Sequence, residues 1–476
     1  MKKILAITFL ILLSCSSSDK TIDEESTKDV PAVTYSNVKV YITEADQSKL
    51  FDLKTEKIPV YRENNNFSIL VNPEVTYQKM DGFGYTLTGG SALHINNMST
   101  NKRQNLLKEL FKWDTNNIGV SYLRVSIGAS DLDEMPFSYN DVPNGETDIN
   151  QTKFSIQKDK ENLIPVLKEI LAINPNIKIM GSPWSPPTWM KTNKSFIGGS
   201  LKEEYYASYA KYFVKYIKAM ASEGINIDAI TVQNEPLHDG NNPSLFMNAN
   251  DQAKFIKNHL GPTFESEGIT TKIIIYDHNA DRTDYPISIL DDPEANKYID
   301  GSAFHLYGGS IEALNNVHNK HPNKNLYFTE QWVGVNSKFE DNLKWHVREL
   351  IVGASRNWCK TVLEWNLAAN SNLKPHTDGG CTECLGALTI DGDTVKKNVA
   401  YYIVAHASKY VRPDSFRIQT NTSSDLPNVA FKTPSGKIIV IVLNNSSSDK
   451  AFNLKTPSES ISTSLNAGAV ATFIWN

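Results

Sequence analysis

The chain has 476 residues, of which 40% are hydrophobic and 10% aromatic, so it can bury a large core and form one large domain with a smaller one. Its formal net charge is -5, from 48 basic and 53 acidic residues, and a basic run occurs only at the extreme amino terminus. This pattern excludes the electrostatic footprint of a nucleic-acid-binding protein and favours an uncharged partner.

The first 14 residues have the pattern of a secretory signal. A basic start, "MKK", precedes an apolar run from Ile4 to Leu13 that is too short to span a bilayer as a mature helix. The following "LLSC" resembles a bacterial lipobox, in which Cys15 is lipidated after cleavage of residues 1–14. We therefore expect export and a lipid anchor at Cys15 in the bacterial cell envelope, at the outer membrane. Simple cleavage to a secreted protein is the alternative.

Residues 15–33 are expected to carry the anchor and a flexible tether, because "SSSDKTIDEESTKDVPAV" is polar and acidic with almost no apolar residues. Contact with a membrane is expected through the lipid only. From residue 34 to residue 77 apolar and polar residues alternate in short runs: "VKVYITEADQ", "IPVYRE" and "FSILVNPEVTY". These runs predict antiparallel strands.

Residues 78–408 alternate between apolar runs and amphipathic stretches. The apolar runs are "QKMDGFGYT", "VSYLRVSIG", "IKIMGSPW", "IDAITVQNE", "TKIIIYDH", "DGSAFHLY", "NLYFTEQ" and "KTVLEWN". The stretches with helical periodicity include "NKRQNLLKELFKW", "KENLIPVLKEIL", "YYASYAKYFVKYIKAMASEG" and "FEDNLKWHVRELIVGA", and "VKKNVAYYIVAHASKY" can supply a last helix. Eight such strand and helix units predict an α/β fold, a (β/α)8 TIM barrel.

Residues 409–476 return to short alternating runs, such as "VAFKTPSGKIIVIVLNN" and "AGAVATFIWN". Because similar runs also precede the barrel, the simplest arrangement is one β-sandwich built from both ends of the chain. We expect the protein to be a monomer.

Three cysteines remain after the anchor site. Cys381 and Cys384 form a C-x-x-C pair, for which a small loop disulfide suits an exported protein. A redox-active pair and half of a zinc site are alternatives, but thioredoxin-like surroundings and a second C-x-x-C are both missing from the sequence. Cys359 is expected to be a buried thiol.

Two glutamates stand where barrel strands are expected to end. Glu235 ends the fourth strand in "ITVQNEPLH", and Glu330 ends the seventh in "NLYFTEQ". Catalytic groups of barrels of this kind lie at the carboxyl ends of the strands, around one shared pocket. Two carboxyl groups there fit glycoside hydrolysis, in which one group protonates the leaving oxygen and the other attacks the sugar or activates water.

Other predicted strand ends carry polar or aromatic residues that suit a sugar. Aromatic faces pack on the C–H surfaces of pyranose rings, while Asp, Asn and His hold hydroxyl groups. Each aromatic residue taken singly also fits core packing, but their recurrence at strand ends favours substrate binding. The candidate substrate-binding residues are Arg124, Asp131, Trp184, Asn234, His305, Tyr307 and Trp365.

Taken in order, the motifs "MDGFGYTLTGGSA", "LRVSIGASD", "SPWSPPTWMKTN", "VQNEPLH", "FTEQW" and "EWNLAAN" resemble glucosylceramidase-like glycoside hydrolases of family thirty, which also contains β-1,6-glucanases. The resemblance implies a retaining β-glycosidase with Glu235 as acid/base and Glu330 as nucleophile. It also implies a sugar subsite containing Asp131, Trp184, Asn234 and Trp365, and a substrate that is a β-glucan or a glucosylated lipid.

This chain departs from the family pattern after the eighth strand. Many relatives carry a Gly-Gly-Pro-Asn loop there, whereas this chain reads "DGGCTECLG", with Cys381 after Gly380. Whether that loop contacts the sugar is therefore not determined by the resemblance. The altered loop and "LHDGNNPS" at residues 237–244 favour a bacterial glucanase-like branch over a lipid-cleaving one.

Two other classes of function compete with this interpretation. A metal-dependent hydrolase needs a ligand cluster, and the pair His318 and His321 on a predicted polar helix end is better explained as solvated surface. We therefore expect neither a metal nor a cofactor. A non-catalytic sugar-binding lipoprotein on the same fold is the other alternative, although a binding module needs no matched acid and nucleophile.

The two glutamates are expected to differ in protonation. A general acid must be protonated near neutral pH, so the pKa of Glu235 should be raised by the nearby charge of Glu330, which must stay ionised to attack. A retaining enzyme should hold the two carboxyl groups about 5 to 5.5 Å apart, whereas an inverting one needs ~6.5 to 9.5 Å.

Overall fold

The computed structural model describes residues 34–61, 63–114 and 116–475. The predicted signal segment 1–14, the anchor site Cys15 and the tether up to residue 33 lie outside these described residues. Beyond Thr34 the chain forms one compact unit, Tyr35–Asn476. Within the described residues, every helix is too short or too polar to cross a bilayer.

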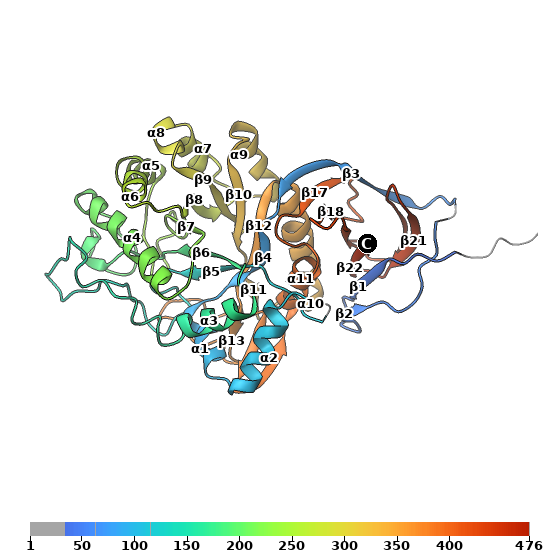
Figure 1. The fold of residues 1–476 in the computed structure, drawn as a ribbon, viewed down its shortest axis with the longest axis horizontal. Helices are drawn as coiled ribbons and strands as arrows, with labels where there is room; N and C mark the ends of the chain where they lie inside the picture. The colour runs from blue at the N-terminus through green and yellow to red at the C-terminus, as the bar shows by residue number, and fades with distance from the viewer. Residues whose placement is uncertain (1–33, 62, 115, 476) are drawn as a thin grey trace, which may run out of the picture. The chain divides into compact units, whose positions relative to one another are not determined.

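Eight parallel strands close into a barrel in the order β10-β12-β4-β5-β6-β7-β8-β9 (Figure 1). Each of the eight predicted apolar runs overlaps one of these strands, so the predicted TIM barrel is confirmed. The strands are β4 (Gly82–Thr86), β5 (Tyr122–Ser126), β6 (Lys178–Ser182), β7 (Ala229–Thr231), β8 (Lys272–Asn279), β9 (Ile299–His305), β10 (Asn325–Glu330) and β12 (Cys359–Asn366).

The barrel interior is filled by side chains, as its all-apolar strands predict. One buried cluster takes a single side chain from each of seven strands: Tyr122, Met180, Ala229, Ile274, Ala303, Tyr327 and Leu363. Residues on the opposite faces of the same strands pack against the helices in the main hydrophobic core. The barrel is therefore packed, and only its strand ends are free to carry chemistry.

Helices surround the barrel, and the five predicted amphipathic stretches all contain helix. The helices are α1 (Gly89–Asn96), α2 (Thr100–Phe111), α3 (Leu163–Ile173), α4 (Tyr206–Ser222), α5 (Ala249–Phe255), α6 (Gly261–Ser266), α7 (Asp284–Leu290), α8 (Pro293–Asn296), α9 (Leu314–Lys320), α10 (Phe339–His346) and α11 (Val399–Ser408). Short 3-10 turns, η1 (Thr188–Met190), η2 (Glu203–Tyr205) and η4 (Ile311–Ala313), and π-helical segments, η3 (Ile256–Leu260) and η5 (Val347–Ala354), complete the set.

Two helical stretches differ from the prediction in detail. The stretch 339–354 begins as α10 but continues as the π-helical η5, which widens its hydrogen bonding to i→i+5. The start of "VKKNVAYYIVAHASKY" is not helical, because Thr394–Lys397 form strand β16, which pairs with β15 (Leu388–Asp391). The helix α11 starts only at Val399, after Asn398.

Both ends of the chain meet in one nine-stranded β unit, as predicted. Its strand order is β2-β1-β22-β19-β18-β17-β3-β20-β21, so the amino-terminal β1 lies directly beside the carboxyl-terminal β22 (Figure 1). The strands are β1 (Lys39–Thr43), β2 (Leu50–Leu53), β3 (Phe67–Lys79), β17 (Phe416–Thr420), β18 (Asn428–Lys432), β19 (Ile438–Leu443), β20 (Lys450–Lys455), β21 (Ser460–Leu465) and β22 (Val470–Trp475).

One predicted strand of this unit is wrong. In the described part of "IPVYRE", residues 58–61 and 63, Pro59 and Val60 form isolated bridges in place of a strand, because proline has no N–H to donate to a ladder. Strand β1 pairs with β22 on one side and with β2 on the other, and the sequence analysis does not predict β2. Strands β17, β20 and β21 were also not predicted.

Small strands tie together the loops at the carboxyl end of the barrel. Strand β11 (Val333–Gly334) follows barrel strand β10 and pairs with β14 (Cys384–Leu385), which belongs to the long loop after β12. Strand β13 (Ala368–Ala369) pairs with β15. The loops that follow the seventh and eighth barrel strands are therefore fixed to each other.

Candidate active site

The structure brings Glu235 and Glu330 together at the carboxyl ends of the barrel strands. Glu330 is the last residue of β10, and Glu235 lies four residues beyond the end of β7. Their side chains are buried, with 6% and 7% of their surface exposed. One carboxylate oxygen of each lies within 4.8 Å of the other and of a ring nitrogen of His305. Two carboxyl groups so close in a buried site repel each other when both are ionised, so nearby protons or positive side chains must offset their charge.

The backbone around Glu235 is unusual for a residue with a side chain. Glu235 has a φ of 43°, in the left-handed region, and its N–H donates to the carbonyl of Asp277 at 2.9 Å. Strand β8 bulges where this bond forms, with φ of 72° at Tyr276 and 68° at Asp277. Such bulges and left-handed residues re-aim side chains and are typical of functional sites.

Arg124 on β5 connects four polar residues at the bottom of the site. Its side chain is fully buried, and it donates to Ser182 Oγ at 3.0 Å, Asn234 Oδ1 at 2.6 Å and Asp277 Oδ2 at 2.9 Å. A fourth bond, at 2.5 Å, joins Arg124 Nη1 to Glu330 Oε2. Arg124 therefore gives Glu330 a fixed positive partner and orients the amide of Asn234.

His305 at the end of β9 lies between two carboxylates. Its Nδ1 is 3.1 Å from Glu235 Oε1 and its Nε2 is 3.1 Å from Asp277 Oδ1. Burial alone opposes a charged ring, but the carboxylates of Glu330, Asp277 and Glu235 outweigh it and raise the pKa of His305 to about 9. At neutral pH the ring is therefore an imidazolium that donates to both neighbours.

The pKa shifts of the two glutamates run opposite to those expected from the sequence, with that of Glu235 lowered and that of Glu330 raised. Burial acts to raise the pKa of Glu235, but the hydrogen bond and charge of His305 outweigh it and hold that pKa below its usual range. Burial raises the pKa of Glu330 above its usual range, against the opposing charges of His305 and Arg124. The prediction of a raised pKa at Glu235 is thus wrong for the protein without substrate. The sequence analysis did not foresee a second proton carrier 3.1 Å from Glu235.

Aromatic side chains form the wall of the pocket above the glutamates. The rings of Trp184 and Trp365 lie 5.4 Å apart, and the guanidinium of Arg124 lies 4.8 Å from the Trp184 ring centre. Tyr307, with 40% of its surface exposed, donates its hydroxyl to Glu330 Oε1 at 3.0 Å. The pocket therefore combines flat apolar surfaces with fixed polar groups.

The pocket has a volume of about 380 Å³, large enough for a sugar unit. Its lining includes six of the nine predicted catalytic and substrate-binding residues: Asp131, Trp184, Glu235, Tyr307, Glu330 and Trp365. The other three, Arg124, Asn234 and His305, are buried in contact with one another or with the glutamates. All nine thus gather at one site.

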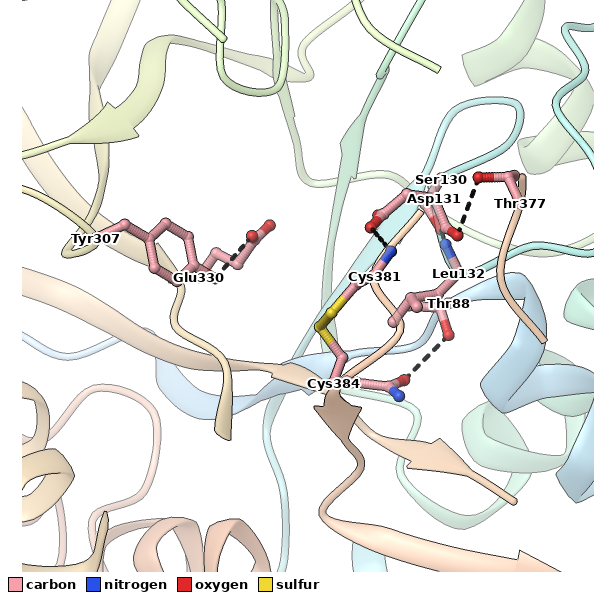
Figure 2. Close-up of a disulfide and its surroundings, with 10 residues drawn as sticks. Thr88, Ser130, Asp131, Leu132, Tyr307, Glu330, Thr377, Cys381 and Cys384 are labelled. Carbon is pink, nitrogen blue, oxygen red and sulfur yellow. Dashed lines mark hydrogen bonds between the residues drawn. A yellow bond between two sulfur atoms is a disulfide. The ribbon is translucent and has the colours of Figure 1, made fainter. Parts of the chain in front are cut away.

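A disulfide completes the wall of the pocket. Cys381 and Cys384 are bonded, with their sulfur atoms 2.07 Å apart, which decides among the alternatives that the sequence left open. Figure 2 shows the N–H of Cys381 pointing at the carboxylate of Asp131, to which it donates at 3.2 Å. The same loop grips the backbone of Asp131, whose carbonyl accepts from the N–H of Thr377 at 2.9 Å. The loop that departs from the family pattern therefore positions Asp131.

The carboxyl group of Asp131 is itself perturbed. Burial, and then the charge of Glu330, raise its pKa to about 7. The bond from Cys381 opposes this rise, because a backbone N–H stabilises the ionised form. Asp131 therefore changes charge near neutral pH.

Several residues of the site were not predicted. Asp277, which pairs with Arg124 and His305, lies in the predicted strand "TKIIIYDH". Its carboxyl group follows four apolar residues, and this pattern could have identified it as a site residue. Trp332, His238 and Asn241 line the pocket from loops. Trp332 directly follows "FTEQ", but loop residues such as His238 and Asn241 carry no periodic signal.

One group of described residues could offer ligands to a metal ion: Glu235, His305 and Glu330. A guanidinium nitrogen of Arg124 already lies 2.5 Å from Glu330, so its charge competes with a cation there. The other pair considered for a metal, His318 and His321, makes separate contacts. The His318 ring stacks on Trp358 at 3.7 Å, and His321 faces Asp291 at 3.0 Å.

Family models cover most of the chain. The model of the glycosyl hydrolase family 30 TIM-barrel domain matches residues 80–411, and that of the family 30 β-sandwich domain matches residues 414–473. Among curated proteins, the chain is 32% identical over 391 residues to an endo-1,6-β-D-glucanase of Neurospora crassa, covering 78% of this chain and 80% of the relative. It is 29% identical over 458 residues to the lysosomal acid glucosylceramidase of Mus musculus, covering 90% and 87%.

Solved structures give the same result. The endo-β1,6-glucanase BT3312 superposes with a TM-score of 0.86 at 35% identity, covering 92% of this chain and 99% of that one. SrfJ from Salmonella typhimurium also gives a TM-score of 0.86, at 26% identity and with the same coverage.

Proposed function

The chain belongs to glycosyl hydrolase family 30 and is a β-glycoside hydrolase, and on this premise we propose that it cleaves β-1,6-linked glucan with retention of configuration. In this proposal Glu330 is the nucleophile and Glu235 is the acid/base. The observation that carries it is the approach of the two carboxylates to within 4.8 Å. Retaining enzymes hold their carboxyl groups about 5 to 5.5 Å apart, which leaves no room for a water between them.

In the first step, Glu330 attacks the anomeric carbon while the leaving oxygen takes a proton from Glu235. Arg124 and Tyr307 both donate to Glu330, so they hold its carboxylate in one orientation. The proton on Nδ1 of His305 faces Glu235 Oε1, and its transfer along that bond makes Glu235 an acid without changing the net charge of the site.

In the second step, Glu235 removes a proton from water, and the water attacks the glycosyl ester on Glu330. Esterification removes the negative charge of Glu330, so the pKa of Glu235 falls and the group becomes the base that this step needs. The product sugar leaves with the β configuration of the substrate.

The relatives support the choice of a β-1,6-glucan. Three curated proteins at 32% identity and the solved structure at 35% identity are named endo-1,6-β-glucanases. The glucosylceramidase of mouse is similar at 29% identity, so a glucosylated lipid is the substrate class to test against.

Product analysis tests both parts of the proposal. The purified protein should release soluble oligosaccharides from β-1,6-glucan faster than from β-1,3-glucan, and faster than it releases glucose from glucosylceramide. Proton NMR during the first minutes should show the β-anomer before mutarotation. A first-formed α-anomer would rule out retention, and preferred cleavage of glucosylceramide would overturn the substrate assignment. Glu330→Gln protein is the control for contaminating hydrolases.

We also propose that the mature protein is held at the bacterial outer membrane by lipid on Cys15. The support is the sequence of residues 1–33 alone, with its basic start, apolar run, lipobox-like "LLSC" and polar tether. An enzyme fixed at the envelope would act on glucan where its products can be taken up.

A further inference from the structure

A second pocket adjoins the catalytic pocket. It has a volume of about 470 Å³ and is called the outer pocket here; its lining includes Gln331, Trp332, Asn336, Asn342, Trp345 and Glu383. Trp332 lines both pockets. Gln331 directly follows the proposed nucleophile, and its backbone carbonyl accepts from the N–H of Trp365 at 2.8 Å. The two pockets therefore share a wall and are close enough to hold neighbouring parts of one ligand.

The lining of the outer pocket suits a sugar. Two indole rings, both partly exposed, offer flat apolar faces, and three side-chain amides with one carboxylate offer groups for hydroxyls. The amide of Asn336 is already fixed, because it donates to Glu383 Oε1 at 3.1 Å. The polar groups are therefore oriented before a ligand arrives.

Gln331, in the lining of the outer pocket, carries a buried polar atom without a partner in the described part of the chain. Its side chain is 7% exposed, and its Oε1 is buried without a hydrogen-bond partner among the described residues. A buried acceptor without a donor is unfavourable, so such atoms in native proteins call for an explanation. This oxygen is closed to solvent, so the Gln331 side chain must turn toward the outer pocket before a sugar hydroxyl can donate to it.

Gly334 keeps one ring of the outer pocket bare. A Cβ at this position would lie 3.4 Å from Cη2 of Trp332 and 3.7 Å from Ser337 Oγ, in van der Waals contact with both. Gly334 has no left-handed φ that would require glycine, and it pairs in register with Cys384. A residue with a side chain could stand here, and it would cover the indole.

We propose that the outer pocket is a subsite for a second glucosyl unit of the β-1,6-glucan whose neighbouring part occupies the catalytic pocket. This inference rests on the proposed function. The subsite makes longer chains better substrates, whereas an aryl β-glucoside, which fills only the catalytic pocket, gains nothing from it. Binding energy from such a remote unit raises kcat/KM for the oligosaccharide.

The test compares substrates of different length in the wild-type protein and in Gly334→Val and Gln331→Leu variants. Gly334→Val adds a side chain against the Trp332 ring in the lining of the outer pocket, at a strand position that favours valine, and Gln331→Leu removes the unpaired acceptor at similar size. The matched control is Val335→Ala on the same loop, which is 40% exposed and outside the lining of both pockets.

In wild-type protein, kcat/KM should rise with the length of β-1,6-linked oligosaccharides of two to six units. Each pocket variant should lose about tenfold in the ratio of kcat/KM for the longer oligosaccharides to that for the aryl glucoside. Gln331→Leu should not lower the melting temperature. The control variant should keep the wild-type ratio.

An unchanged ratio in both pocket variants would overturn the subsite and leave the proposed function intact. Equal losses on the aryl glucoside and the oligosaccharides would also overturn it, because they would show damage to the catalytic pocket. Failure of wild-type protein to cleave any β-1,6-linked oligosaccharide, with the aryl glucoside still hydrolysed, would instead overturn the proposed function and this ligand with it.

Discussion

Replacing Cys381 and Cys384 together with serine should reduce activity far more than it reduces stability. The disulfide joins residues separated by 3 positions, so the loop that it closes is short. The chain-entropy relation gives about 2 kcal/mol of stability for a loop of this length. In a chain of this size the unfolding entropy converts that loss into a melting temperature lower by roughly 2 °C. The variant should therefore stay folded during an assay.

The effect on activity acts through Asp131. The N–H of Cys381 donates to its carboxylate at 3.2 Å, and a loop freed from Cys384 would no longer hold this donor in place. Hydrogen bonds to charged groups contribute about 1.5 to 3 kcal/mol, which corresponds to a loss of roughly 10- to 150-fold in kcat/KM. Because the lost bond stabilises the ionised form, the pKa of Asp131 should also rise from about 7.

The assay follows hydrolysis of an aryl β-glucoside across the neutral pH range, with thermal melting measured in parallel. Wild-type protein treated with a reductant should behave like the double-serine variant, while the variant itself should not respond to reductant. The triple variant, with Asp131→Asn added to the two serines, should have nearly the same kcat/KM as Asp131→Asn alone, because both changes remove the same interaction. Rates within twofold of wild type, with the bond shown to be broken, would refute the reasoning, and so would fully additive losses.

The remaining predictions concern the proposed acid/base pair and the anchor. Glu330→Gln should reduce turnover of every β-glucoside by several powers of ten, since the nucleophile is lost. Glu235→Ala should still form the glycosyl intermediate from a dinitrophenyl glucoside and be rescued by azide to a β-glycosyl azide; rescue of a Glu330 variant to an α-glycosyl azide instead would exchange the two roles. The proton shared by His305 and Glu235 leaves as the pH rises through about 9, so kcat/KM should fall there. Asp277→Asn removes one carboxylate that raises the pKa of His305, so this alkaline limb should move to lower pH, and an unmoved limb would contradict the shared proton. Cys15→Ala should abolish lipid labelling and release the protein from the membrane fraction, and unchanged fractionation would refute the anchor.

The sequence alone determined the barrel, because its eight strands are apolar on both faces and alternate with amphipathic helices. Such a pattern has few other solutions, and it placed Glu330 correctly at a strand end, whereas the fourth strand ends four residues before Glu235. The joining of both chain ends in one β unit followed from the short alternating runs that precede and follow the barrel. The predicted strand at "IPVYRE" failed because Pro59 cannot donate to a ladder, a detail that alternation of apolar residues does not report.

The tertiary structure decided what depends on distances of a few ångströms. The sequence predicts His305 at a strand end but does not single out Asp277, and only barrel closure places the ring of His305 3.1 Å from both Asp277 and Glu235. That contact lowers the pKa of Glu235 below its usual value, although burial acts to raise it. Likewise, the spacing of Cys381 and Cys384 permits a disulfide, but only the fold brings it against Asp131. Local periodicity determines which face of each element is buried, whereas electrostatic balance in a pocket depends on groups that meet from distant parts of the chain.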